Sequence, residues 1–285
     1  MTKLVYDTRD DKLFEQRGMK NLYWLDDLGA IPLSELRPGD DSFLFAGARS
    51  IEDYEKLTAG FNRLRDSVSE RLPLLNLDTV LKQIEQNCET LPRPKTWTWR
   101  LDEPIPKDLE YPLFVRTAKS SWKLGGKISK VCNNKQLEAE AFELRRAFGF
   151  DQPILAREWL NIVTAGKTAY GPVPLEIRTW IVDSVPFAWS FHHLQFGGNS
   201  ELFPLARNDI DRLFDLASQV NCFESRLVCA DFVKTTDGSW VFLEAGPGSC
   251  AGTAHEFVYK SVASRLADKT YRDEACLPDK FGQLF

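Results

Sequence analysis

The sequence has no hydrophobic run long enough to span a bilayer, which needs about 18 or more consecutive apolar residues. Its first residues, MTKLVYDTRDD, mix acids with bases and contain no apolar core of the kind that a secretory signal requires. We therefore expect a cytoplasmic protein with no membrane partner.

Cysteines are few and widely separated, and no two of the 6 form a C-x-x-C pair. A zinc ribbon or a disulfide framework would need paired spacing, so reduced thiols are expected. The 3 histidines leave Ser/His or Cys/His nucleophilic catalysis without a convincing set of partners. An excess of positive charge is also missing, since 36 basic residues face 41 acidic ones, which argues against nucleic-acid binding.

What the chain does have is the composition of a globular protein, with 43% hydrophobic and 27% charged residues over 285 positions. Short apolar runs predict strands. Helical spacing of apolar residues after Ser50 and after Asp78, each read as an N-cap, predicts helices. The predicted strands are 4–6, 42–46, 72–77, 113–117, 127–132, 154–160, 175–183, 185–191, 227–234 and 239–244. The predicted helices are 50–68, 78–87, 135–148, 207–220 and 253–267.

The pattern of elements changes along the chain. Residues 1–76 read as a small α/β unit without a catalytic cluster. A helix and a proline-dense connector follow over 77–111. From 112 to 285 the sequence predicts strands with long loops and a few helices, so the fold class is α/β with α+β character.

A run of positive charge stands out in this acidic protein. Residues 111–137 contain six Lys or Arg side chains and no carboxylate. Within it, SSWKLGGK joins two predicted strands, and its glycines and lysines suit a flap whose N–H and ammonium groups surround an anion. The alternative is a solvated basic hairpin.

A second feature is the predicted hairpin over 227–244, which turns at Asp237-Gly238. That turn places Asp231 and Glu244 opposite each other, so the two carboxylates share a face. Two like charges there are unfavourable unless a cation lies between them, and Mg²⁺ held by carboxylates and substrate phosphates is the usual solution. The alternative is that both acids are structural or surface groups.

A third feature is Arg178, which shares a strand face with Glu176. Its guanidinium could bind a phosphate or a substrate carboxylate through two hydrogen bonds, or it could form a structural pair. Two other phosphate motifs fail. GKT at 166–168 lacks the earlier P-loop glycine, and 244–252 places the third glycine of a Rossmann fingerprint one position late.

The order of these parts resembles the ATP-grasp superfamily over about residues 70–260. The matching segments are PLFVRT, SSWKLGGKI, ILAREWLNI, LEIRTWIVDSVPF and ADFVKTTDGSWVFLEAGPG. FVR…SWKLGG and LEAGPG are most similar to the clade named for two arginines and one lysine. Common members of the superfamily carry a metal-binding Asn where this chain has Gly246. The resemblance implies a Rossmann-like domain at the N-terminus, then a nucleotide-grasping subdomain at about 112–160 and a metal-binding subdomain at about 161–285.

The resemblance also implies roles for individual residues. Phosphates of ATP would be held by Arg116 in the first strand, by the flap and by Arg178. The flap residues concerned are Lys123, Gly125, Gly126 and Lys127. The hinge residues expected around adenine are Glu158, Trp159 and Leu160. Asp231 and Glu244 would bind Mg²⁺, and Arg178 and Lys123 would act in catalysis.

The function implied is an ATP-dependent carboxylate–amine ligase that works through an acylphosphate and releases ADP. Its partners would be a small-molecule or peptide carboxylate and an amine nucleophile. Two alternatives remain open from the sequence: a kinase that phosphorylates a small molecule, and a non-enzymatic nucleotide-binding module, which Gly246 motivates.

Overall fold

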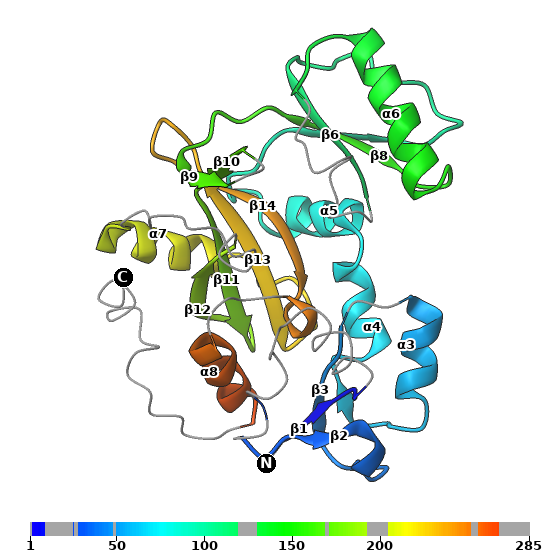
Figure 1. The fold of residues 1–285 in the computed structure, drawn as a ribbon, viewed down its shortest axis with the longest axis vertical. Helices are drawn as coiled ribbons and strands as arrows, with labels where there is room; N and C mark the ends of the chain where they lie inside the picture. The colour runs from blue at the N-terminus through cyan, green and yellow to red at the C-terminus, as the bar shows by residue number, and fades with distance from the viewer. Residues whose placement is uncertain are drawn as a thin grey trace.

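The computed structural model describes residues 2–8, 25, 28–47, 50–118, 130–168, 171–192, 205–251 and 256–267. These residues form three lobes, one built around each of three four-stranded sheets (Figure 1). The helix α5 (Leu77–Asn87) lies between the lobe that carries α6 and the lobe that carries α3 and α4. Within the described part of the chain, no helix is both long and apolar enough to cross a membrane.

The N-terminal lobe is a parallel sheet in the order β2-β1-β3-β4. Its strands are β1 (Lys3–Tyr6), β2 (Ile31–Pro32), β3 (Ser42–Phe45) and β4 (Leu64–Arg65). Every residue of β3 is buried, and its sequence accordingly has three consecutive apolar residues, Phe43, Leu44 and Phe45, rather than an alternating pattern.

The helix predicted behind Ser50 forms, but it is shorter than expected. Ser50 is the N-cap of α3 (Ile51–Thr58), and its hydroxyl accepts a hydrogen bond from the Asp53 amide at 3.1 Å. The helix ends before Gly60, whose φ of +89° turns the chain out of helical geometry. The prediction of one helix to residue 68 was therefore wrong, because β4 occupies part of that stretch.

The strand predicted at 72–77 does not form. Residues Leu72–Leu74 are a 3-10 turn that joins α4 (Val68–Arg71) to α5. Pro73 explains the difference, because proline has no N–H to donate to a strand ladder and suits the first turn of a helix. The N-cap of α5 is Asn76 rather than the predicted Asp78, whose amide donates to Asn76 Oδ1 at 3.0 Å.

The upper lobe is a sheet in the order β5-β8-β6-β7 with α6 on one face (Figure 1). Its elements are β5 (Thr96–Trp99), β6 (Leu113–Thr117), β7 (Lys130–Val131), α6 (Asn134–Phe148) and β8 (Ile154–Glu158). Leu113, Val115 and Ala156 pack in one cluster with apolar side chains of α6. Alternation along β6 then turns Arg116 to the opposite face, away from α6.

The strand β5 was not predicted, because it lies within the proline-dense stretch that the sequence indicates as a connector. Its four residues, TWTW, form an antiparallel ladder with β8. The strand predicted at 127–132 is described only for β7, and residues 127–129 lie outside the described residues.

The central lobe is an antiparallel sheet in the order β12-β11-β13-β14. Its strands are β11 (Glu176–Val182), β12 (Val185–Phe191), β13 (Leu227–Lys234) and β14 (Trp240–Pro247). The helices α7 (Arg207–Ala217) and α8 (Glu256–Leu266) pack against this sheet, and a hairpin of β9 (Thr164–Thr168) and β10 (Gly171–Pro174) lies at its upper end (Figure 1). The predicted bounds of β6, β12 and β13 are confirmed at both ends.

A buried polar junction ties the N-terminal lobe to the turn that follows β14. Arg71 is 2% exposed, and its Nε donates to Asp66 Oδ2 at 2.6 Å. Arg71 also donates to the Ser249 hydroxyl, and Ser249 donates to Asp66. At the neighbouring Gly248, an added Cβ would lie 2.5 Å from the Leu227 side chain, so only glycine fits without movement. The segment after Glu244 is therefore held against two lobes.

Candidate functional site

The site begins with a row of polar side chains across the central sheet. Arg178 on β11 lies opposite Asp231 on β13, and Asp231 lies opposite Glu244 on β14. Residues directly opposite each other on antiparallel strands point to the same face, so the three side chains share one. The predicted pairing of Asp231 with Glu244 is confirmed, and Gly238, with φ of +90°, makes the expected turn between their strands.

Arg178 and Asp231 form a buried fork. Arg178 Nε donates to Asp231 Oδ1 at 2.9 Å, and Nη2 donates to Oδ2 at 2.8 Å. Both side chains are nearly closed to solvent, at 11% and 4% exposed. Burial alone would lower the pKa of Arg178, but the Asp231 carboxylate outweighs it and raises that pKa overall. The guanidinium therefore stays charged at any ordinary pH.

The second arginine–acid pair joins two lobes. Arg116 on β6 donates from Nη1 to Glu244 Oε2 on β14 at 2.6 Å, across 128 residues of sequence. Burial tends to raise the pKa of Glu244, but Arg116 more than offsets this and the pKa is lowered overall. An ionised Glu244 thus lies where the face of the upper sheet meets the row on the central sheet.

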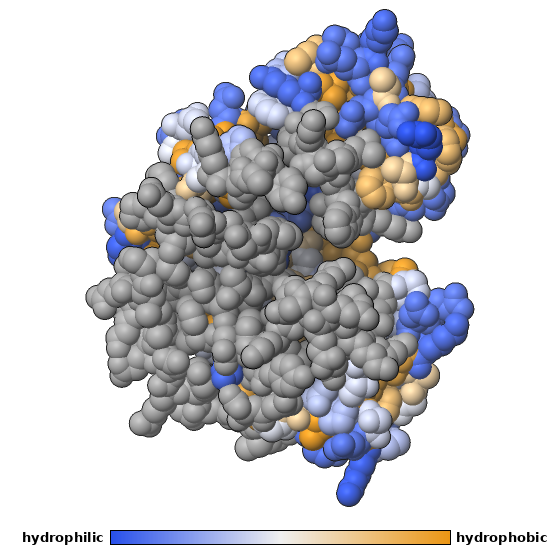
Figure 2. Space-filling view, viewed as in Figure 1, coloured by the Kyte–Doolittle hydropathy of each residue, from blue (hydrophilic) through white to orange (hydrophobic). Residues whose placement is uncertain are grey.

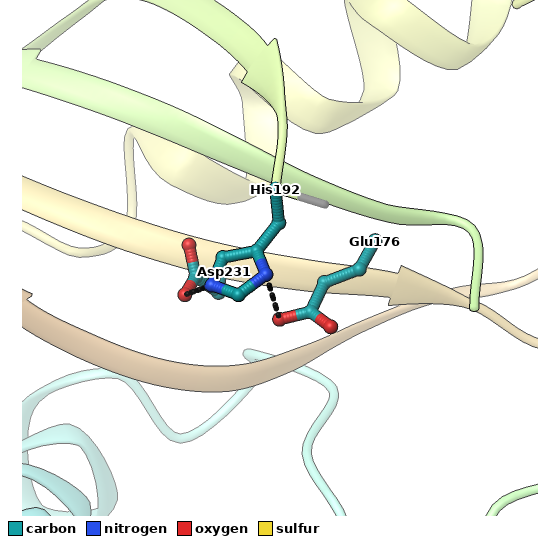
Figure 3. A group of neighbouring side chains, drawn as sticks. All are labelled: Glu176, His192 and Asp231. Atoms are coloured by element: carbon teal, nitrogen blue, oxygen red, sulfur yellow. Dashed lines mark ion pairs between the residues drawn. The ribbon is translucent and has the colours of Figure 1, made fainter. Parts of the chain in front are cut away.

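A third acid and a histidine complete the polar face of the central sheet (Figure 3). His192, just after β12, points its Nδ1 toward Glu176 Oε1 and its Nε2 toward Asp231 Oδ2, both at 3.7 Å. Ligand atoms of Glu176, His192 and Asp231 all lie within 4.8 Å of one another, so the three could hold a divalent cation. The Asp231 carboxylate would then contact both the cation and Arg178.

His192 was missed as a site residue at the sequence level. It is adjacent to His193, and two adjacent histidines in a strand point to opposite faces, so the pair alone does not indicate a metal site. The usable signal was the pairing of 185–191 with 175–183, because it brings the residue after β12 opposite Glu176. The His192 amide indeed donates to the Glu176 carbonyl at 3.1 Å.

The donor set at the row fits a hard cation such as Mg²⁺, which takes oxygen ligands. Asp231 and Glu244 provide carboxylates on one face, and each is matched by an arginine in the present arrangement. A cation with bound phosphates would satisfy both sides, because phosphates would take the guanidinium groups while the carboxylates took the cation. The metal roles of Asp231 and Glu244 nonetheless remain predictions.

The predicted hinge and flap residues contribute less to this geometry. Glu158 ends β8, and its carboxylate accepts from the Lys95 amide at 3.3 Å. The Trp159 amide donates to the Pro112 carbonyl, with the Lys130 ammonium 5.3 Å from the centre of its ring. Leu160 follows, partly buried. The predicted flap residues Lys123, Gly125, Gly126 and Lys127 lie outside the described residues.

A shallow pocket in the N-terminal lobe is lined by Pro38, Gly39, Gly60, Phe61 and Asn62, none of which is an acid or a base. The face shown in Figure 2 is also hollowed between the lobe of α6 and the lobe of α3, with hydrophobic atoms visible in the hollow. The shallow pocket offers no chemistry, so the candidate site remains the polar row.

Comparisons with known proteins place this geometry in a family. The model of the ATP-grasp domain, family 3 of the clade named for two arginines and one lysine, matches residues 78–267. No curated protein matches the sequence significantly. The fold is similar to that of a RimK domain ATP-grasp protein from Sphaerobacter thermophilus DSM 20745, with a TM-score of 0.59 and 14% identity over 94% of this chain and 98% of the other. It is also similar to D-alanine–D-alanine ligase from Bacillus anthracis, with a TM-score of 0.57 and 15% identity over 94% and 95%. The expected fold class is confirmed.

Proposed function

The chain belongs to family 3 of the ATP-grasp clade named for two arginines and one lysine, and on that premise we propose that it is an ATP-dependent carboxylate–amine ligase. The observation that carries the proposal is the meeting of two arginine–acid pairs where the upper and central sheets face each other. Phosphoryl transfer is catalysed mainly by positioning and charge neutralisation, and these four side chains are groups of that kind.

The reaction has two steps. A substrate carboxylate oxygen attacks the γ-phosphorus of ATP. The bond between that phosphorus and the β,γ-bridging oxygen breaks, and ADP leaves with the bridging oxygen. An amine then attacks the carbonyl carbon of the acylphosphate, inorganic phosphate leaves, and the amine loses a proton. The product is an amide. The similarity of the fold to that of a D-alanine–D-alanine ligase supports this chemistry.

Arginines of the row act on the phosphates in this proposal. Arg116 and Arg178 exchange their carboxylate partners for phosphate oxygens when the nucleotide binds, since a planar guanidinium binds either anion through parallel hydrogen bonds. Lys123 and Lys127 add positive charge from the flap. The glycines at 125 and 126 would let the backbone approach the phosphates closely.

Acids of the row hold the metal in this proposal. Asp231 and Glu244 would bind Mg²⁺ once released from their arginines, and Glu176 and His192 are close enough to Asp231 to add ligands. The ion would supply neutralisation of phosphate charge. The hinge segment of Glu158, Trp159 and Leu160 receives the adenine ring, and the likeness to the clade suggests that the carboxylate belongs to a peptide or protein.

The nucleotide product tests the proposal directly. Purified protein with Mg²⁺, ATP, and a panel of amino acids and peptides should release ADP and phosphate, because the acylphosphate route leaves ADP. A kinase would instead form a stable phosphorylated product without an added amine. Release of AMP and pyrophosphate would contradict the ligase mechanism, and a lack of any metal-dependent turnover would favour a non-enzymatic nucleotide-binding module.

A further inference from the structure

Arg157 on β8 is a buried cation that has few hydrogen-bond partners among the described residues. It is 3% exposed, and its Nη2 is buried without a hydrogen-bond partner in the described residues. Its Nε reaches only the Thr96 hydroxyl, at 3.4 Å. Within the same residues no carboxylate forms an ion pair with it. A buried guanidinium in this condition carries a desolvation cost that no contact with the described residues offsets.

The position of Arg157 places it at the candidate site. Along β8 it alternates with Ala156, which belongs to the cluster under α6, so Arg157 lies on the opposite face of the sheet. It pairs in register with Phe114 of β6, two residues from Arg116. Arg116 and Arg157 therefore share the face on which Arg116 reaches Glu244.

The electrostatics agree with this placement. The pKa of Arg157 falls to about 10, first because of burial and then because of the nearby Arg116, while Glu244 acts in the opposite direction. Glu244 is already bonded to Arg116, so it does not neutralise both guanidinium groups. Arg157 itself has no acidic partner among the described residues, and a ligand with several anionic oxygens would provide one.

We propose that Arg157 is a nucleotide-binding residue that donates from Nη2 to a phosphate oxygen of the nucleotide beside Arg116. This inference rests on the proposed function, because ATP is the anion which that function brings to this face. A guanidinium would bind a substrate carboxylate through the same kind of charged hydrogen bond. The phosphate chain is favoured because the residues that follow Arg157 directly are the proposed adenine hinge, Glu158 to Leu160.

The test is calorimetric titration of Mg²⁺·ADP into the wild-type protein and into Arg157→Met, with no carboxylate substrate present. Methionine keeps much of the volume and removes the unpaired charge. We expect the Kd to rise about ten- to one-hundred-fold, which is the range for a lost hydrogen bond to a charged group. The midpoint of urea unfolding should stay the same or increase, because no buried charge remains to be solvated.

Arg145 provides a matched control. It is another buried arginine whose guanidinium nitrogens lack partners among the described residues, but it belongs to α6, on the far face of the same sheet. Arg145→Met should bind Mg²⁺·ADP as the wild type does. An equal weakening in both variants would show a general effect of the substitution and would overturn the inference.

Other outcomes are equally decisive. An unchanged Kd in a folded Arg157→Met would overturn the inference and leave the proposed function standing. If that variant does not fold, Arg157→Lys takes its place. It should weaken binding several-fold, because an ammonium group lacks the planar fork, and an unchanged Kd would again overturn the inference. A wild-type protein that binds no Mg²⁺·ADP would refute the proposed function together with the inference.

Discussion

Replacing Glu244 by glutamine should reduce ATP turnover about a thousand-fold or more while leaving the protein folded. The change keeps the volume of the side chain and removes one negative charge from the point where the two sheets meet. Loss of a metal contact at a phosphoryl-transfer centre costs several kcal/mol of transition-state stabilisation, and each ~1.4 kcal/mol is a factor of ten in rate.

The measurement is the steady-state rate of ADP release at saturating Mg²⁺, with circular dichroism and urea unfolding as checks of the fold. Glu244 is 27% exposed, so solvent screens part of the charge that is lost beside Arg116, and the variant should lose less stability than one that breaks the buried Arg178–Asp231 pair. Glu138→Gln on the exposed side of α6 is the control and should turn over ATP at the wild-type rate. Near-normal turnover in Glu244→Gln would show that the role of Glu244 is purely structural.

Replacing Asp231 by asparagine should abolish turnover and also destabilise the protein. Asp231 is buried and is the partner of Arg178 through both carboxylate oxygens. Its removal leaves a buried guanidinium without its counterion, and breaking a buried pair in this way costs about 3–5 kcal/mol of unfolding free energy. The measurements are urea unfolding and ADP release on the same preparation.

The two strands that hold this fork offer a matched control at their other end. Asp183 and Arg226 form the same kind of fork, with bonds of 2.6 and 2.9 Å, but Asp183 is 43% exposed. Water and salt screen such a pair, so Asp183→Asn should cost only about 0–1 kcal/mol and should leave turnover intact. Equal losses of stability in the two variants would contradict the assigned burial of the Arg178–Asp231 pair.

Local features of this chain could be predicted from its sequence where the signal is short-range. Ser50 is the expected N-cap, and β13 has the expected bounds. The pairing of Asp231 with Glu244 was predicted from the turn at Asp237-Gly238, but the register next to the turn pairs Phe232 with Phe242. A bulge between Asp231 and Phe232 shifts that register by one residue and brings Asp231 opposite Glu244.

What the sequence could not provide depends on contacts between distant segments. The bond from Arg116 to Glu244 spans 128 residues, and nothing near either residue signals the other. Nothing in the sequence distinguishes Arg157 from the other polar residues of the hinge strand, and only the register of the sheet shows which face it occupies. His192 became part of a possible metal group only when β12 was placed beside β11.

The central claim is that the protein activates a carboxylate as an acylphosphate, and transfer of an oxygen atom tests it most directly. A carboxylate substrate labelled with oxygen-18 is incubated with ATP, Mg²⁺ and an amine, and the products are analysed by mass spectrometry. The account predicts one labelled oxygen in the inorganic phosphate, because the carboxylate oxygen that attacks ATP leaves with the phosphate when the amide forms. Label in AMP, or amide formed with unlabelled phosphate, would contradict it.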